Sequence, residues 1–417
     1  MKNKLNLEIK DYGPINNANI ELNKINIIGG VNGSGKSSVS RILYSFLKAN
    51  TPGIERYVLE EIIGGINEII NLAENPDPMG EHGLPHKYTI DDDISEVLEE
   101  YEISKNKLLN SNVNFIIDEF MITDIIDKID LVKCLFDDND EDGYAGIVNL
   151  ILRREISPFK GKIKLYNDSF LCNVTKKWFG ADYYNNYNVE SSGNFEKLTN
   201  VLYLDSVSLY DFISLFSYPE GNLRLSYEHN EDILNYLNLD STEDNDNFFI
   251  VEKINQFIKG NFEFKFLAPF FVSDLNDVSL LKDDVSSGYK QIGLIQLLLR
   301  NGSLKNNSYL IIDEPEVNLH PEWQFKLAEI LVLLAKELNI NIYINSHSPA
   351  FIESIDAFTE YYDMEDDVCY YLTEESEIKG KYNFTKIDSN ELSKLYDNLG
   401  NIYFLIDQIR LQKRLGE

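Results

Sequence analysis

Cysteine is scarce in this chain of 417 residues, which contains three, at Cys134, Cys172 and Cys369. They are far apart and show no C-x-x-C spacing, so neither a disulfide framework nor a cysteine-based zinc site is expected. Long apolar runs are missing as well, since none approaches the roughly 18 residues that would span a bilayer. The lysine-containing start, Met1–Asn6, is not followed by an apolar signal segment. We therefore expect a cytoplasmic protein that has no membrane segment.

Positive charge is also in short supply. The chain has 38 Lys and Arg residues against 69 Asp and Glu residues, which gives a formal net charge of −31. Such an excess of acid disfavours a surface that binds nucleic acid or anionic membrane over a broad area. Basic residues do cluster within Arg153–Lys164 and Arg410–Arg414, but such clusters are also typical of a solvated face that balances nearby acids. A nucleic-acid partner is possible but is not indicated by the charge. A basic protein partner would suit the negative charge.

One stretch carries a specific chemical signal. Residues 25–38 read Ile-Asn-Ile-Ile-Gly-Gly-Val-Asn-Gly-Ser-Gly-Lys-Ser-Ser and match the phosphate-loop pattern G-x-x-x-x-G-K-[ST]. An apolar strand precedes the pattern and a helix is expected to follow it. Glycines let successive backbone N–H groups turn toward a phosphate, and the helix adds its positive N-terminal dipole. The residues expected to bind a nucleoside triphosphate are Gly30, Asn32, Gly33, Ser34, Gly35, Lys36, Ser37 and Ser38.

Within this loop, two side chains have distinct expected roles. Lys36 would reach the β- and γ-phosphates, and the Ser37 hydroxyl would bind Mg²⁺. The expected ligands of the chain are therefore ATP and Mg²⁺.

Composition and periodicity divide the chain into three parts. Residues 1–86 contain an expected strand hairpin and then the phosphate loop. Residues 87–200 are rich in acidic stretches with helical periodicity, so we expect an inserted, mostly helical lobe. In residues 201–417, short apolar strands alternate with apolar helices such as Pro321–Leu338, a pattern typical of an α/β core. The expected fold class is α/β, with one core formed by the two outer parts.

A second set of candidate residues follows two of these strands. The apolar run from Ser308 ends in Asp313 and Glu314, and it predicts a buried strand that delivers both carboxylates beside the phosphate loop. Asp313 is expected to hold Mg²⁺, directly or through water, and Glu314 to act as general base on the attacking water. His347 follows the next strand, where it either hydrogen-bonds the γ-phosphate or has only a structural role.

The segment Val285-Ser-Ser-Gly288 precedes a predicted helix. Ser286 or Ser287 can cap that helix, so its N-terminus either binds an anion or is merely capped. The residues alone leave both interpretations open.

The order of these motifs resembles that of ABC-type ATPases. In that family a Walker A loop (here 30–37), a signature (285–288), a Walker B strand (310–315) and a switch histidine (His347) follow one another. The elements at 313–321 and 345–349 look like those of the branch that contains RecF, the heads of structural-maintenance-of-chromosomes (SMC) proteins and the OLD-like ATPases. AAA-family ATPase subunits of prokaryotic defence systems such as PARIS and Septu are similar too. The resemblance covers roughly residues 1–50 and 200–360.

This resemblance implies an ATPase that works as a head-to-tail dimer or higher oligomer. Ser286 and Gly288 of one protomer would contact the γ-phosphate bound at Lys36 of the other, and Asn318–His320 would form the loop between the two sites. The catalytic residues would be Lys36, Glu314 and His347. Neither site is complete in a monomer on this view.

Two departures from the family pattern bear on the rate of hydrolysis. The family's sensor glutamine is missing, because the chain has no glutamine before Gln256, so Asp205 or Ser206 would have to serve or turnover would be slow. The signature reads Val-Ser-Ser-Gly-Tyr where the family has Leu-Ser-Gly-Gly-Gln.

OLD nucleases also append a TOPRIM domain, for which the stretch after His347 is too short.

Three functional hypotheses follow. The leading one is an ATP-driven sensor or regulator in an anti-phage or toxin-like system, which controls a separate effector protein. An alternative is a DNA-binding repair or tethering ATPase like RecF or an SMC head, which would need a basic groove or long heptad arms that the sequence does not show. A transporter nucleotide-binding domain is disfavoured, because a large acidic segment separates Lys36 from Ser286.

Overall fold

A computed structural model describes most of the chain. The described residues are 4–54, 87–89, 94–110, 140–156, 161–176, 187–205, 228–237, 248–265, 268–274, 279–281 and 287–394, with a few single positions at 63–70 and 239. Cys134 and Ser206 lie outside them, as do residues 395–410 and most of 54–72, two stretches in which the sequence has the apolar spacing of a helix.

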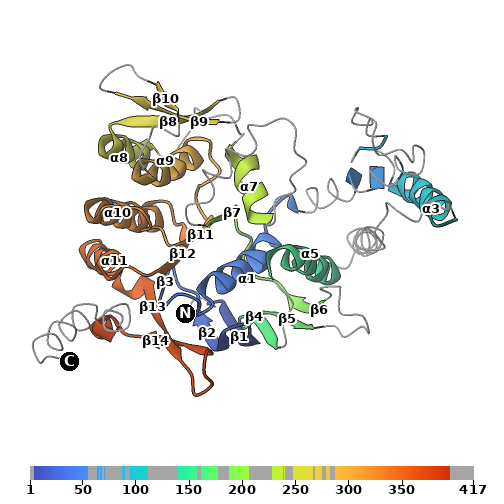
Figure 1. The fold of residues 1–417 in the computed structure, drawn as a ribbon, viewed down its shortest axis with the longest axis horizontal. Coiled ribbons are helices and arrows are strands. Elements are labelled where there is room, and N and C mark those ends of the chain that lie inside the picture. Colours follow the sequence, from blue (N-terminus) through green and yellow to red (C-terminus); the bar gives the residue numbers. More distant parts are fainter. Residues whose placement is uncertain are drawn as a thin grey trace, which may run out of the picture.

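A single large sheet organises the described residues (Figure 1). Its 11 strands lie in the order β6 (Tyr187–Gly193), β5 (Phe170–Lys176), β4 (Lys162–Tyr166), β1 (Asn6–Tyr12), β2 (Ile15–Glu21), β14 (Tyr382–Ile387), β13 (Val368–Glu375), β3 (Ile25–Gly29), β12 (Asn341–Ser346), β11 (Tyr309–Asp313) and β7 (Val201–Leu204). The expected hairpin is confirmed, because β1 and β2 pair antiparallel. The α/β fold class is likewise confirmed.

The centre of this sheet is parallel. β3 pairs in parallel with β12 and β13, and β11 pairs in parallel with β12 and β7. Every residue of β3 and β11 is buried, and apart from Asn26 and Asp313 neither strand contains an amide or a charged side chain. Because these strands run the same way, the loops that leave their carboxyl ends gather at one edge of the sheet.

Helices cover both faces of the sheet, and the β-strand period assigns neighbouring residues to opposite sides. Ile28 and Ile311 contribute to the core on the side of α1 (Lys36–Lys48) and α5 (Asp140–Glu155). Ile27 and Ile312 contribute to the opposite core, with α8 (Phe248–Ile258), α9 (Ser287–Arg300), α10 (Pro321–Glu337) and α11 (Pro349–Tyr361). The other described α-helices are α3 (Ile94–Asn110) and α7 (Glu228–Leu237), and a three-stranded sheet contains β8 (Gly260–Lys265), β9 (Ala268–Ser273) and β10 (Ser279–Leu281).

The structure differs from the sequence-based expectation in the middle of the chain. Residues 87–200 were expected to be mostly helical, yet β4, β5 and β6 lie in this range and extend the main sheet through the pairing of β4 with β1. The strand signal is present in β4, where Ile163 and Leu165 are buried and Lys162 is exposed. The lysines of this stretch thus belong to a strand with one buried face. The apolar stretch 262–272, which could be taken for a single strand from its sequence, contains parts of both β8 and β9, which pair antiparallel.

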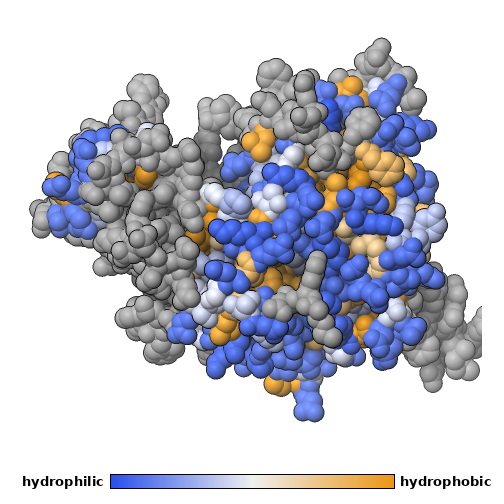
Figure 2. All heavy atoms as spheres, turned by 180° about the vertical axis from the view of Figure 1, so that it is seen from behind, coloured by the Kyte–Doolittle hydropathy of each residue, from blue (hydrophilic) through white to orange (hydrophobic). Residues whose placement is uncertain are grey.

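The surface is dominated by polar side chains. Figure 2 shows the face opposite to that of Figure 1, where hydrophilic residues surround smaller groups of apolar ones. Within the described residues, no helix is long and apolar enough to cross a membrane. Cys172 and Cys369 are both free and buried, as the scattered positions of the cysteines predict.

Candidate functional site

The phosphate loop connects β3 to α1, as the sequence predicts. Gly30 has a φ of +153°, and a Cβ there would come within 1.7 Å of the Thr373 hydroxyl oxygen. Gly35 has a φ of +98° at the N-cap of α1, and a Cβ would lie 2.7 Å from Ile15 Cγ1. Both glycines are therefore required by backbone conformation and by the close approach of neighbouring strands.

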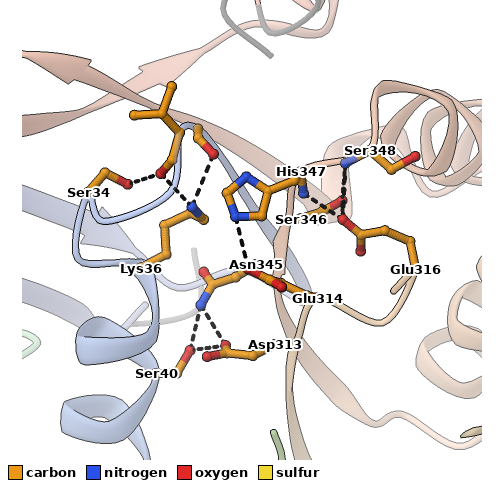
Figure 3. Close-up of polar contacts among 12 residues, drawn as sticks. Ser34, Lys36, Ser40, Asp313, Glu314, Glu316, Asn345, Ser346, His347 and Ser348 are labelled. Atoms are coloured by element: carbon orange, nitrogen blue, oxygen red, sulfur yellow. Dashed lines mark hydrogen bonds and ion pairs between the residues drawn. The ribbon is translucent and has the colours of Figure 1, made fainter. Parts of the chain in front are cut away.

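Lys36 is folded back over this loop (Figure 3). Its Nζ donates to the carbonyl oxygens of Gly30 at 3.0 Å and Val31 at 2.9 Å. The Ser34 hydroxyl donates to the same Val31 oxygen at 2.9 Å. Carbonyl groups thus hold the ammonium at the centre of the loop, in the position where a phosphate-binding lysine is needed.

The environment of Lys36 favours an anionic ligand. Burial lowers the pKa of its ammonium to about 8, although the negative charges of Glu314, Asp313 and Glu316 oppose this shift. A buried cation has lost its hydration, so an ion pair with a phosphate stabilises it more than it would stabilise an exposed cation. Ser37 is exposed at the start of α1, and Asn32 and Gly33 are exposed in the loop.

Asp313 ends β11 and lies at the centre of a buried hydrogen-bond network. Its Oδ1 accepts from Ser40 Oγ at 2.7 Å and from Asn345 Nδ2 at 2.6 Å, and its Oδ2 accepts from Tyr203 Oη at 2.8 Å. Asn345 Nδ2 also donates to Ser40 Oγ at 2.7 Å. Donors from α1, β7 and β12 therefore fix the orientation of a carboxylate that is only 2% exposed.

The donor set fits a magnesium ion or its bound water. Each carboxylate oxygen can accept two bonds, so Asp313 Oδ2 keeps a free lone pair. In the described part of the chain, Asn345 Oδ1 is buried and has no hydrogen-bond partner. Hard oxygen atoms of this kind, together with the Ser37 hydroxyl, are the ligands that Mg²⁺ prefers.

Behind Tyr203 lie further buried polar groups. The His229 ring is 4.2 Å from the Tyr203 ring between centroids, and the Tyr44 ring is 6.1 Å away. His229 Nδ1 lies 2.8 Å from Glu155 Oε2, and both side chains are fully buried. The aromatic ring that orients Asp313 is therefore itself held in place by α5 and α7.

Glu314 and His347 face each other at the same edge of the sheet. His347 Nε2 lies 2.9 Å from Glu314 Oε1. Glu314 has a left-handed backbone, with φ +49°, and its N–H donates to the Asn345 carbonyl at 2.8 Å. Burial and the positive charge of Lys36 hold the pKa of His347 below its ordinary value, although Glu314 opposes them. The imidazole is therefore neutral at pH 7.

Glu316 was quoted in the sequence motif but given no role there. Its Oε1 accepts from Ser346 Oγ at 2.8 Å, from His347 N at 2.6 Å and from Ser348 N at 3.0 Å. Burial raises the pKa of this carboxyl, against the lowering effect of the backbone hydrogen bonds from His347 and other donors. The third carboxylate of the Asp-Glu-Pro-Glu run thus faces the histidine loop.

Other predicted residues lie elsewhere in the fold or outside its described part. Ser286 falls outside the described residues, and Gly288 lies in the first turn of α9, in the helical layer that Figure 1 draws beside α8. His320 caps α10, with Nδ1 accepting from the Glu322 N–H at 3.4 Å. Asp205 follows β7, with Oδ2 3.9 Å from Arg41 NH2. The roles predicted for these residues stay predictions.

Comparisons with known proteins bear on the whole chain. A family model described as an AAA ATPase domain matches residues 4–352. No curated protein matches the chain. Among solved structures, the SMC head domain from Thermotoga maritima is 11% identical with a TM-score of 0.39, and the alignment covers 93% of this chain and 100% of that one.

Two further solved structures are similar at the same low level. An Smc head domain bound to the C-terminal domain of ScpA, derived from Pyrococcus furiosus, is 9% identical with a TM-score of 0.42, covering 95% of this chain and 99% of that one. The ADP conformation of an ATP-binding cassette of an ABC transporter is 12% identical with a TM-score of 0.36, covering 94% of each chain.

Proposed function

Because the chain belongs to the family of AAA ATPase domains and is an ATPase, we propose that ATP and Mg²⁺ bind at the sheet edge described above and drive a switch between copies of the chain. One observation supports the site most directly. Lys36, Asp313, Glu314 and His347 come from segments up to about 300 residues apart, and they converge at the carboxyl ends of three parallel strands (Figure 3).

The proposed roles follow from position and chemistry. Lys36 contacts the β- and γ-phosphates, and the backbone N–H groups of 30–38 surround them. Ser37 and Asp313 would hold Mg²⁺, which would supply positive charge to the phosphate oxygens. Asn345 Oδ1, with no partner among the described residues, would be available to accept a hydrogen bond from a water in the site.

Glu314 is the proposed general base. Its carboxylate lies at the open side of the site, with the side chain 32% exposed, so a water can reach it. His347 is neutral and can donate from Nε2 to either Glu314 or the γ-phosphate. The position of the loop that carries His347 would therefore depend on whether the γ-phosphate is present.

We extend this to a dimer in which Ser286 and Gly288 of one copy contact the γ-phosphate held by the other. The exposure of Asn32, Gly33 and Ser37 supports it, because a partner can approach the loop from that side. Asn318–His320 would lie between the two sites. Asp205, at the end of β7, would take the place of the missing glutamine.

For the biological role, we propose a sensor or regulator ATPase of an anti-phage defence system that controls a separate effector protein. The support is the resemblance of the motifs at 313–321 and 345–349 to the OLD-like branch, and a net charge of −31, which suits a basic protein partner better than DNA. Protection of cells against phage, given by this gene together with its neighbours and lost with Lys36→Ala, would support it. ATP-stimulated, salt-sensitive DNA binding would instead favour the RecF-like or SMC-like alternative.

The decisive experiment on the site is Glu314→Gln. The variant should bind ATP with unchanged affinity, while hydrolysis falls by about 10²- to 10⁴-fold, the usual contribution of a general base. The ATP-bound dimer should accumulate and be visible by analytical ultracentrifugation. Glu322→Gln, at an exposed position in α10, is the matched control and should hydrolyse normally. Normal hydrolysis by Glu314→Gln would remove Glu314 from the proposed mechanism.

A further inference from the structure

We propose that Glu316 is a positioning residue for ATP hydrolysis, which fixes the turn at 346–348 and thereby holds His347 against Glu314. This inference rests on the proposed function of His347 and goes beyond it, because it assigns a role to the second glutamate of the Asp313–Glu316 run.

The contacts of Glu316 are concentrated on one oxygen atom. Its Oε1 accepts three hydrogen bonds, from the Ser346 hydroxyl and from the backbone N–H groups of His347 and Ser348 (Figure 3). The three donors belong to consecutive residues, so a single carboxylate oxygen defines the backbone path of the whole turn. The bond to His347 N is 2.6 Å, which is short even for a charged acceptor.

Burial of the Glu316 carboxylate has a free-energy cost that a merely structural role would not require. The side chain is 7% exposed, and burying a carboxylate without a paired cation carries a large desolvation penalty. Its Oε2 has no hydrogen-bond partner within the described residues. An amide oxygen could accept the same three bonds at a lower cost. The negative charge therefore strengthens the three bonds at the expense of stability.

The turn that Glu316 fixes is tied at two points to the loop that follows β11. Glu314 N–H donates to the Asn345 carbonyl at 2.8 Å, on one side of the pair formed by His347 and Glu314. Glu316 Oε1 accepts from Ser346, His347 and Ser348, and so fixes the turn from the other side of this pair. Within the Glu314 loop itself, Val317 N–H donates to the Glu314 carbonyl at 3.1 Å. The backbone that carries the His347 side chain is thus fixed from Asn345 to Ser348.

Ser348 extends the effect to α11. Its N–H is bound by Glu316, and its hydroxyl accepts from Phe351 N at 3.2 Å, which caps the helix. Without the Glu316 carboxylate, the turn would keep the cap but its three donors would lose their shared acceptor. A displacement of about 1 Å in a catalytic group can reduce a rate by about 100-fold. The expected consequence is slow hydrolysis in a folded protein that still binds ATP.

The test is a double-mutant cycle with Glu316→Ala, His347→Ala and the variant that carries both substitutions. Steady-state hydrolysis gives kcat, and calorimetry gives the affinity for ATP with Mg²⁺. We expect Glu316→Ala to lower kcat by about 10- to 100-fold and to leave the affinity within about twofold. The double variant should be no slower than the slower single one, because Glu316 acts through His347. Glu316→Gln, which keeps an acceptor oxygen, should recover most of the lost rate.

Two results would overturn the inference while leaving the proposed role of His347 intact. One is a normal kcat in Glu316→Ala when His347→Ala is slow, and the other is a double variant whose defect is the product of the two single defects. A normal rate in His347→Ala would instead refute the role of the histidine itself. If Glu316→Ala does not fold, Glu316→Asp tests the same point, since the shorter side chain keeps the charge but draws the oxygen away from its donors. A normal kcat in Glu316→Asp would then count against positioning.

Discussion

Replacing Tyr203 by phenylalanine would test the network that orients Asp313. The substitution removes one hydroxyl, which donates to Asp313 Oδ2 at 2.8 Å. The ring is packed against His229 and Tyr44, with centroids 4.2 Å and 6.1 Å away, so a phenylalanine ring should keep the same place. The change therefore isolates a single hydrogen bond to a buried carboxylate.

The expected cost follows from the burial of both partners. Tyr203 is 1% and Asp313 is 2% exposed, so solvent does not weaken the bond by screening. A hydrogen bond to a charged group contributes about 1.5–3 kcal/mol, and its loss here leaves Oδ2 without a donor from the described part of the chain. We expect the free energy of unfolding without nucleotide to fall by about 2 kcal/mol, which is about a 30-fold change in the folded-to-unfolded ratio.

Magnesium should reduce this cost. If Asp313 binds Mg²⁺, the cation compensates part of the negative charge of this carboxylate, which has lost the hydrogen bond from the Tyr203 hydroxyl. ATP with Mg²⁺ should therefore stabilise Tyr203→Phe more than it stabilises the wild type, whereas ATP with a chelator should not. The assay is urea denaturation of both proteins under three conditions, without nucleotide, with ATP and EDTA, and with ATP and Mg²⁺.

Tyr343 supplies the matched control. It is fully buried on β12, and its hydroxyl has no hydrogen-bond partner among the described residues. Tyr343→Phe therefore removes the same atom without a bond and should not lower the free energy of unfolding. Equal destabilisation by both substitutions would show that the bond to Asp313 is not the cause. A gap between the two variants that magnesium leaves unchanged would argue against Asp313 as a metal ligand.

Two other predictions concern the cation and the imidazole of the site. Lys36→Ala should weaken ATP binding by at least about 10-fold by calorimetry, the loss of one charged hydrogen bond, without lowering the melting temperature of the nucleotide-free protein. The reason is that burial lowers the pKa of Lys36 to about 8, so the empty site is not stabilised by the charge, and a clear drop in that temperature would contradict this. The lowered pKa of His347 means that the unfolded chain takes up a proton at a higher pH than the folded one. The free energy of unfolding should therefore fall as the pH is lowered below the ordinary histidine pKa of 6.5, and His347→Asn should make this slope shallower; equal slopes would refute the shift.

The sequence predicted those parts of the site in which residue type and local pattern suffice. The glycines and Lys36 of the phosphate loop, and Asp313 and Glu314 after an apolar run, are local signals, and each lies where the pattern indicates. The order of the central strands in the chain also indicated that their carboxyl ends would meet.

The rest depends on pairings between distant strands. Tyr203 binds Asp313 only because β7 lies next to β11, and nothing in the residues around Tyr203 marks it as a donor. Glu316 could have been noticed, because a third acidic residue at the end of a buried strand needs a hydrogen-bond partner if it is buried. Its actual partners are set by the position of the loop after β12. The extension of the sheet by β4 was missed for the same reason, since its partner β1 lies about 150 residues earlier in the chain.

The place of β3 in the sheet has a consequence for the synthesis of the protein. β3 is made early, at Ile25–Gly29, but the strands that flank it, β12 and β13, begin at Asn341 and Val368. On the ribosome, the phosphate loop therefore remains without its supporting strands until most of the chain has emerged. Contacts so distant in sequence form slowly, and an apolar strand that has not yet paired is prone to aggregate. The nascent chain should therefore acquire its nucleotide only after β12 and β13 have emerged, so ATP binding would distinguish chains with a closed central sheet from those without one.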